Sequence, residues 1–141
     1  MTQDERLAEI VTAHGGCEGA LLPILIDVQA AFGCIDAQSE AAIAEALNLS
    51  RAEVHGVASF YDDFSAEPDP RPQVQICRAE ACQARGVESV MPAACAAAGD
   101  RVRLKSVYCL GLCSAGPAAR VGDSVYARLD EASLVRLIEE A

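Results

Sequence analysis

The sequence predicts an α+β protein, with a helical bundle in its N-terminal half and a small α/β domain in its C-terminal half. Residues 1–65 place apolar side chains at helical spacing. Residues 73–141 carry short apolar runs around one helical stretch, then a hairpin signal and a last helix. Between them, residues 66–72 contain three prolines at alternating positions, which disfavour both helix and strand. We therefore expect two domains joined by a stiff, extended linker.

The N-terminal domain is expected to be a bundle of short helices. Gly33 is a natural helix stop, and Ser39 is a plausible N-cap for the helix that follows. Ser50 begins a capping-box pattern ahead of another helix. The positions of the second helix that follow helical spacing are Leu22, Leu25, Ile26, Gln29 and Phe32 or Gly33. The expected helices cover residues 4–13, 20–32, 39–47 and 51–60.

The C-terminal domain is expected to begin with a β-α-β unit and to end with a hairpin and a helix. Pro92 should kink or restart the long helix of this unit. Gly122 and Asp123 form a two-residue hairpin turn, and Asp130 can cap the final helix. The expected elements are strands at 73–76, 102–107, 118–121 and 124–128, a helical turn at 79–83, and a helix at 87–98.

Two close pairs of cysteines dominate the chemistry of the sequence. Cys77 and Cys82 are spaced C-x4-C, and Cys109 and Cys113 are spaced C-x3-C. Each pair follows one strand of the β-α-β unit, and the carboxyl ends of parallel strands meet at one edge of a sheet. Four thiolates can therefore converge on one centre. Soft thiolate ligands select zinc, Cu(I) or an iron–sulfur cluster, and the spacing alone leaves zinc and iron–sulfur open.

The residues around these cysteines resemble a known family. The segments 74–77, 80–82, 107–113 and 116–117 are similar to the thioredoxin-like [2Fe–2S] ferredoxins, with the pattern Tyr-Cys-Leu-Gly-x-Cys-x-x-Gly-Pro as the most specific part. The helical segments before residue 62 also match this family. Its members include the small iron–sulfur subunits of NADH:quinone oxidoreductases, of NAD-reducing hydrogenases and of NAD-dependent formate dehydrogenases. The run 77–83 looks most like the gamma subunit of the formate dehydrogenases.

This resemblance implies a fold, a cofactor and partners. It implies a thioredoxin-like domain that binds one [2Fe–2S] cluster through Cys77, Cys82, Cys109 and Cys113. It implies an electron-transfer subunit of a cytoplasmic, NAD-dependent formate dehydrogenase. The expected partners are a diaphorase subunit that binds FMN and NAD, and a molybdenum-cofactor subunit that oxidises formate. The equivalent subunit of a hydrogenase or quinone oxidoreductase is the alternative within this class.

Composition excludes several other classes of function. The net charge of −10 argues against nucleic-acid binding, which needs a basic surface. Residues 1–65 hold eleven acidic and two basic residues, so this half carries almost all of the net negative charge. No apolar run approaches the roughly 20 residues of a membrane span, and the first residues lack the pattern of a signal peptide. Close cysteine pairs in a chain of this kind suggest a reducing cytoplasm.

No catalytic residues are expected in this chain. The sequence has no Gly-rich nucleotide motif after a strand and no nucleophile–base constellation. A structural-zinc interaction module and a thiol oxidoreductase are the competing classes, and the second is weak because C-x-x-C is absent. Cys17, Cys34 and Cys95 are expected to be buried, inert thiols. Arg78 is expected to be solvated, and the alternative is that its charge lowers the cost of the reduced state of a cluster.

Overall fold

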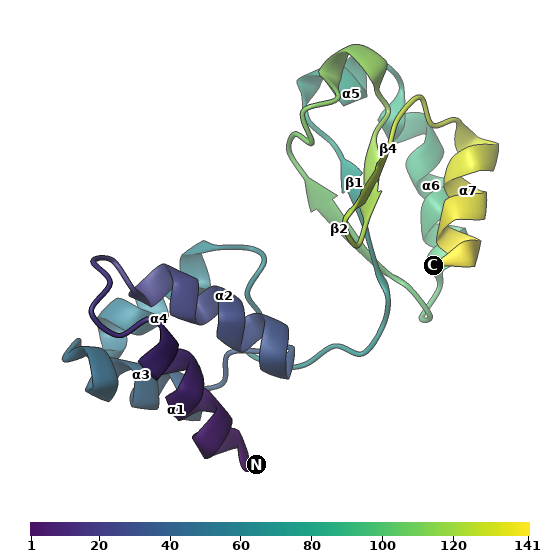
Figure 1. Cartoon of the computed structure of the whole chain (residues 1–141). Coiled ribbons are helices and arrows are strands. Elements are labelled where there is room, and N and C mark those ends of the chain that lie inside the picture. The colour runs from purple at the N-terminus through teal and green to yellow at the C-terminus, as the bar shows by residue number, and fades with distance from the viewer. The chain divides into compact units, whose positions relative to one another are not determined.

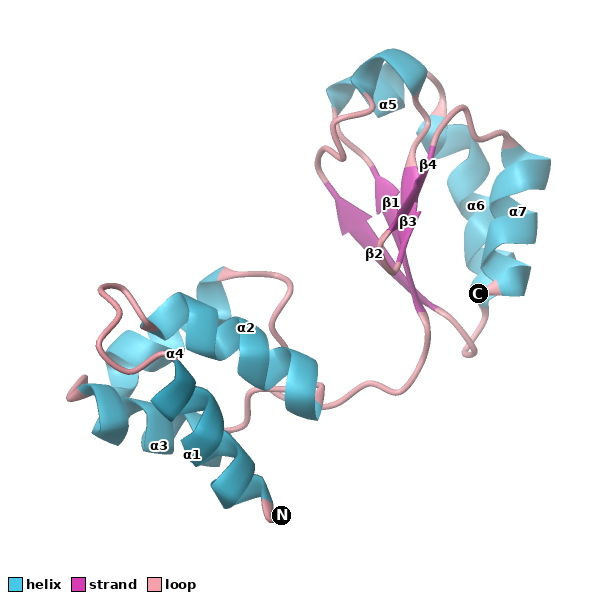
Figure 2. Cartoon of the chain, in the orientation of Figure 1, coloured by secondary structure: helices cyan, strands magenta, loops and turns pink.

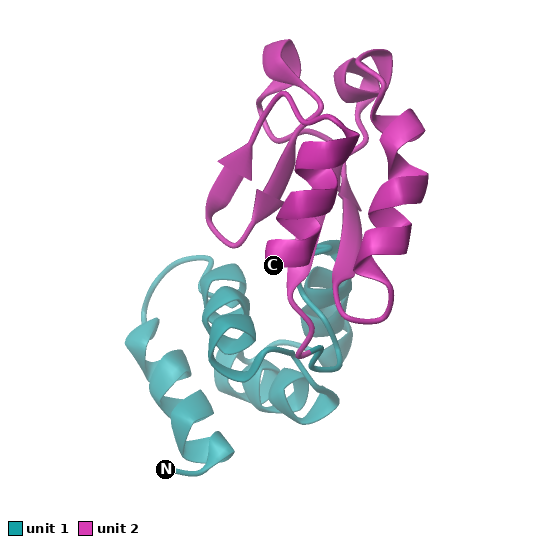
Figure 3. Ribbon diagram, turned by 90° about the vertical axis from the view of Figure 1, so that its right-hand side faces the viewer, with its two compact units in different colours: residues 1–69 teal, residues 70–141 magenta.

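The computed structural model describes residues 1–141 as two compact units, residues 1–69 and residues 70–141 (Figure 3). The first, here the helical unit, contains only helices, and the second, the sheet unit, contains all of the strands (Figure 2). Each unit has its own buried apolar core. The expected α+β class is therefore confirmed. None of the helices is long and apolar enough to cross a membrane.

The helical unit contains the four expected helices. Its core is built from fully buried aliphatic side chains, among them Ile24, Leu25 and Val28 of the second helix. Ile26 is 52% exposed, so the positions that follow helical spacing do not all face the core. Apolar residues occupy almost every position at the start of this helix, and periodicity could not select the inner face. The helices are α1 (Gln3–Ala13), α2 (Leu21–Phe32), α3 (Ala37–Leu47) and α4 (Arg51–Phe60), as labelled in Figure 1.

The helix ends follow capping chemistry, with one correction. Ser50 forms the expected capping box with Glu53 at the start of α4. The N-cap of α3 is Asp36 and not Ser39. One Asp36 carboxylate oxygen accepts the backbone N–H of Ser39 at 2.7 Å, which leaves Ser39 buried in the first turn. Both residue types are good caps, and the helix simply begins at the earlier one.

This cap makes a pH dependence testable. The backbone N–H of Ser39 lowers the pKa of Asp36, and the Ser39 hydroxyl lowers it further. The stabilisation from the charged cap is complete above the ordinary aspartate pKa of about 3.9 and is lost as the pH falls through the folded-state pKa. We expect Asp36→Asn, which can still accept the Ser39 N–H, to lose less stability than the wild type between about pH 5 and pH 3.

Thermal melts across this interval test the pH dependence. Glu18→Gln serves as the control, because Glu18 is an exposed acid in the loop between α1 and α2. If the melting temperature of Asp36→Asn falls with pH as steeply as that of the wild type, the cap does not contribute in this way.

The sheet unit has the expected order of elements. Its four strands lie in the order β2-β1-β3-β4, with β1 parallel to β2 and antiparallel to β3, and with β3 antiparallel to β4. The β3–β4 hairpin turns at Gly122 and Asp123, as predicted. The elements are β1 (Gln73–Cys77), α5 (Glu80–Ala84), α6 (Val87–Ala98), β2 (Arg103–Val107), the 3-10 turn η1 (Cys113–Ala115), β3 (Ala119–Val121), β4 (Ser124–Tyr126) and α7 (Glu131–Glu140).

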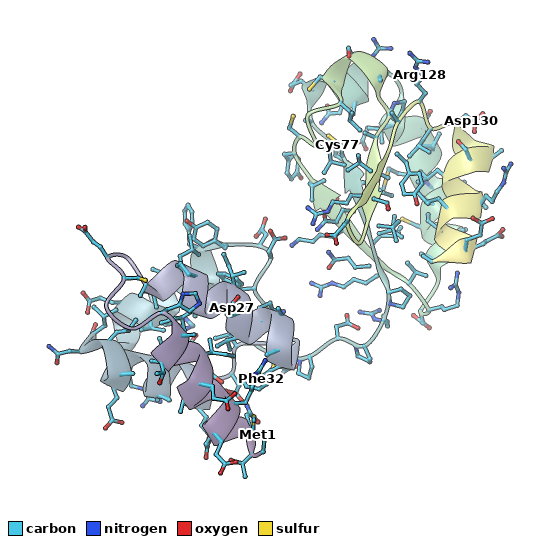
Figure 4. All side chains as sticks on the ribbon, viewed as in Figure 1. Met1, Asp27, Phe32, Cys77, Arg128 and Asp130 are labelled. Carbon is cyan, nitrogen blue, oxygen red and sulfur yellow. The ribbon has the colours of Figure 1, made fainter.

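Two helices provide the core of the sheet unit. α6 and α7 lie side by side, and Leu134 and Ile138 of α7 are buried in the same cluster as Val74 and Ile76 of β1 (Figure 1). Asp130 caps α7 as expected, at the point labelled in Figure 4.

The behaviour of α6 differs from one expectation. The helix runs through Pro92 without ending or restarting. Pro92 is exposed, so the carbonyl that loses its helix partner faces water, and the fixed φ of proline suits a helix. A continuous α6 lets β2 return parallel to β1.

Candidate metal centre

The two cysteine segments leave the sheet from neighbouring points. Cys77 is the last residue of β1 and lies opposite Val107, the last residue of β2. The backbone N–H of Arg78 donates to the Val107 carbonyl at 2.8 Å, which extends the pairing by one residue beyond the strand. Both pairs of cysteines therefore start from the same edge of the sheet, as the β-α-β pattern predicted.

The first pair is buried. Cys77 and Cys82 are each 2% exposed, and Cys82 lies in the short helix α5. Burial raises the pKa of the Cys82 thiol, and a hydrogen bond between the two thiols raises it further. A thiol in this environment loses its proton most readily when a metal cation binds it, so metal binding here releases protons.

The second pair lies at the surface. The sulfur atoms of Cys109 and Cys113 are 3.5 Å apart, and both residues are exposed. The backbone N–H of Gly111 donates to the Cys109 sulfur at 3.3 Å and lowers the pKa of this thiol. The pKa of Cys113 is raised, because its thiol is hydrogen-bonded to Cys109. Cys109 also has a φ of 136°, a conformation that non-glycine residues rarely adopt outside functional loops.

The loop of the second pair packs over the first pair. The backbone N–H of Cys77 donates to the Ala118 carbonyl at 2.9 Å, so the chain returns past Cys77 after Cys113. Gly116 is buried on this path, and a Cβ atom at this position would lie 2.9 Å from the Cys82 sulfur. Figure 4 labels Cys77 among the side chains at this end of the sheet. The four cysteines thus gather at one end of the unit.

The sulfur atoms lie as two pairs and not as one tetrahedral set. One tetrahedral zinc, with Zn–S bonds of about 2.3 Å, needs all four sulfurs within about 3.8 Å of each other. No three cysteine, histidine or carboxylate side chains of the chain are placed to hold a single ion. The thiols are instead arranged as two close pairs. A [2Fe–2S] cluster would take its four thiolates from Cys77, Cys82, Cys109 and Cys113.

The match to a known family spans residues 7–141 and is to the thioredoxin-like [2Fe-2S] ferredoxins. The chain belongs to this family. It is thus a protein of one [2Fe–2S] cluster, which decides against the zinc alternative. The expected thioredoxin-like ferredoxin fold is confirmed.

Curated relatives of this family member are components of oxidoreductases. The chain is 28% identical over 148 residues to a component of the NADH-quinone oxidoreductase of Rhizobium meliloti (strain 1021), covering 99% of this chain and 88% of the relative. It is 25% identical to the HndA component of an NADP-reducing hydrogenase from Solidesulfovibrio fructosivorans, covering 87% and 77%. It is 30% identical to a component of the NADH-quinone oxidoreductase of Buchnera aphidicola, covering 79% and 75%.

Solved structures of an NAD+-reducing [NiFe]-hydrogenase contain a similar fold. The H2-reduced state matches 82% of this chain with a TM-score of 0.67 and 30% identity. The air-oxidised state matches 99% of this chain with a TM-score of 0.63 and 26% identity. The family member spans only 21% and 24% of the two solved chains, so most of each solved chain has no counterpart here.

The remaining cysteines lie outside the cluster site. Cys34 is buried as expected, with a pKa raised by burial. Cys17 and Cys95 are exposed, so the prediction that they are buried is wrong. Cys17 lies in the loop between α1 and α2. Cys95 lies on the solvent side of α6, where the surrounding alanines gave no sign of which face is inward.

The sequence did not predict the ion pair that Arg78 forms with Glu88. Arg78 is partly exposed and also paired, since its guanidinium donates to both carboxylate oxygens of Glu88, at 2.8 and 2.6 Å. The hydrogen bonds from Arg78 lower the pKa of Glu88, so both groups are charged at neutral pH. Glu88 is in the first turn of α6 and follows no periodic or motif spacing relative to Arg78, so only the fold brings them together.

Proposed function

We propose that this ferredoxin is the electron-transfer subunit of a cytoplasmic, NAD-dependent formate dehydrogenase. Cys77, Cys82, Cys109 and Cys113 hold its [2Fe–2S] cluster in this proposal. The partner diaphorase subunit binds FMN and NAD, and a molybdenum-cofactor subunit oxidises formate to carbon dioxide. The chain carries electrons between partners and has no catalytic residues of its own.

One observation carries the proposal: two close thiol pairs lie at the ends of adjacent parallel strands, in a chain whose family binds a [2Fe–2S] cluster. When bound, the cluster takes up and gives back one electron at a time. The buried pair, Cys77 and Cys82, anchors it in the unit. The exposed pair, Cys109 and Cys113, brings it to the surface, where a partner can approach.

The choice of formate dehydrogenase rests on the run from Cys77 to Gln83, which resembles the gamma subunits of those enzymes. The second candidate is the equivalent subunit of an NADH-quinone oxidoreductase or an NAD-reducing hydrogenase. It is supported by the relatives and solved structures to which the chain is similar. Both candidates need a flavin-binding partner that converts two-electron transfer at NAD into single-electron steps.

The native complex distinguishes the candidates. The chain should be purified with its partners under anaerobic conditions, and the metals and the NAD-linked donors of the complex should be measured. Molybdenum and NAD reduction by formate support formate dehydrogenase. Nickel and NAD reduction by hydrogen, or NADH oxidation by quinone without molybdenum, identify the second candidate.

The helical unit offers a surface for the flavin-binding partner. Phe60 at the end of α4 is 77% exposed and packs edge-to-face on Tyr61, with ring centroids 5.1 Å apart. Exposed aromatic side chains are typical anchors of protein interfaces. The strongly acidic composition of residues 1–65 favours a basic partner surface, because complementary charges steer association.

We expect Phe60→Ala to weaken binding of the diaphorase subunit by about tenfold, which corresponds to about 1.4 kcal/mol. The affinity can be measured by titration of the purified partner. Val125→Ala is the matched control, since Val125 is 52% exposed but lies on β4 of the other unit. Equal affinities for Phe60→Ala and the wild type would remove this aromatic pair from the interface.

A further inference from the structure

Arg78 occupies a junction beside the cysteines. It follows Cys77 directly, and its side chain makes two hydrogen bonds to Glu88 and a third, of 3.4 Å, to the Ser106 hydroxyl. Its backbone N–H bonds Val107, and its carbonyl accepts the Gln83 side-chain amide at 2.7 Å. One residue therefore connects the end of β1, the end of β2, α5 and α6.

The ion pair in this junction is only partly exposed. The side chains of Arg78 and Glu88 are 35% and 47% exposed, and their closest atoms are 2.6 Å apart. Two hydrogen bonds in a fork hold the charges in a fixed relative orientation. This geometry keeps each charge at a fixed position close to its partner.

A charged side chain near a redox cluster affects its reduction potential, because reduction changes the charge of the cluster. Four thiolates, two sulfides and two ferric irons carry a formal charge of about −2, and one added electron makes it about −3. A positive neighbour stabilises the reduced form, and a negative neighbour destabilises it. Arg78 directly follows Cys77 in the chain, and Arg78 and Glu88 carry opposite charges.

We propose that Arg78 and Glu88 act as a balanced pair of positioning residues that sets the reduction potential of the cluster. This inference rests on the proposed cluster ligands. Arg78 favours the reduced state, and Glu88 holds the guanidinium and offsets most of its charge. Removing either member leaves the other charge uncompensated beside the site, so the two removals have opposite effects.

The experiment is a redox titration of the full chain, followed by the EPR signal of the reduced cluster. We expect Glu88→Gln to raise the midpoint potential and Arg78→Gln to lower it. Each change should alter the ratio of reduced to oxidised protein at a fixed potential by about fivefold to tenfold. The double variant should return towards the wild type. Glu139→Gln, an exposed acid on α7, is the charge control and should leave the potential unchanged.

Shifts of the same sign in the two variants, or no shift in either, would overturn the inference, because a purely structural role predicts no dependence on the sign of the charge. If Arg78→Gln assembles no cluster, the midpoint potentials of Glu88→Gln and Arg78→Lys test the inference instead. An upward shift in the first and a potential near the wild type in the second support the pair, and an unshifted Glu88→Gln contradicts it. A wild-type chain without a cluster would instead refute the proposed function.

Discussion

Replacing Cys77 by serine is expected to remove the [2Fe–2S] cluster. Cys77 is buried at the end of β1 and supplies one of the four proposed thiolates, and a hydroxyl is a poor substitute for a soft ligand. We expect iron and sulfide contents at least about tenfold below those of the wild type, with loss of the red-brown colour. Cluster binding also stabilises the folded unit, so the apo variant should unfold at a lower temperature.

The matched control is Cys95→Ser. Cys95 lies in the same unit but is exposed on α6 and is not one of the four proposed ligands. This variant should keep a full cluster and its spectrum. A bleached Cys95→Ser beside a coloured Cys77→Ser would show that the proposed ligand set is wrong.

Adding one methyl group at Gly116 should disturb the site almost as strongly. A Cβ atom there would lie 2.9 Å from the Cys82 sulfur and 3.3 Å from a side-chain carbon of Arg85. The backbone of Gly116, with φ −67° and ψ 168°, is open to alanine, so the effect is purely steric. We expect Gly116→Ala to destabilise the unit by about 1–3 kcal/mol and to lower cluster occupancy. Chemical denaturation and iron analysis measure both quantities.

Gly56→Ala is the control for this substitution. Gly56 lies inside α4, and a Cβ atom there would meet nothing within 4 Å. Alanine should stabilise the helix by about 0.5–1 kcal/mol and leave iron content unchanged. A Gly116→Ala chain with normal iron content and normal stability would show that the loop does not press on Cys82 as described.

Much of the fold could be predicted from local signals. Helix stops and caps such as Gly33 and Ser50 mark helix ends directly, because their chemistry acts within one turn. The structure differs from the predictions where the local sequence allowed more than one helix face or more than one N-cap. Residues 21–26 are all apolar, so periodicity could not select a face, and Asp36 and Ser39 are both able to cap α3.

The site could be predicted only in part. Two close cysteine pairs after two strands were enough to place four thiols at one sheet edge. The side chains that surround those thiols are brought there by tertiary contacts, which a local sequence pattern does not reveal. Glu88 reaches Arg78 only because α6 packs beside the strand ends, and Gly116 reaches Cys82 only because the loop folds back.

The most direct measurement is an EPR spectrum of the dithionite-reduced, anaerobically purified chain, with iron and sulfide counted on the same sample. The proposed function predicts an S = 1/2 signal, with about two irons and two sulfides per chain. An EPR-silent sample that contains one zinc and no sulfide would contradict electron transfer by this chain.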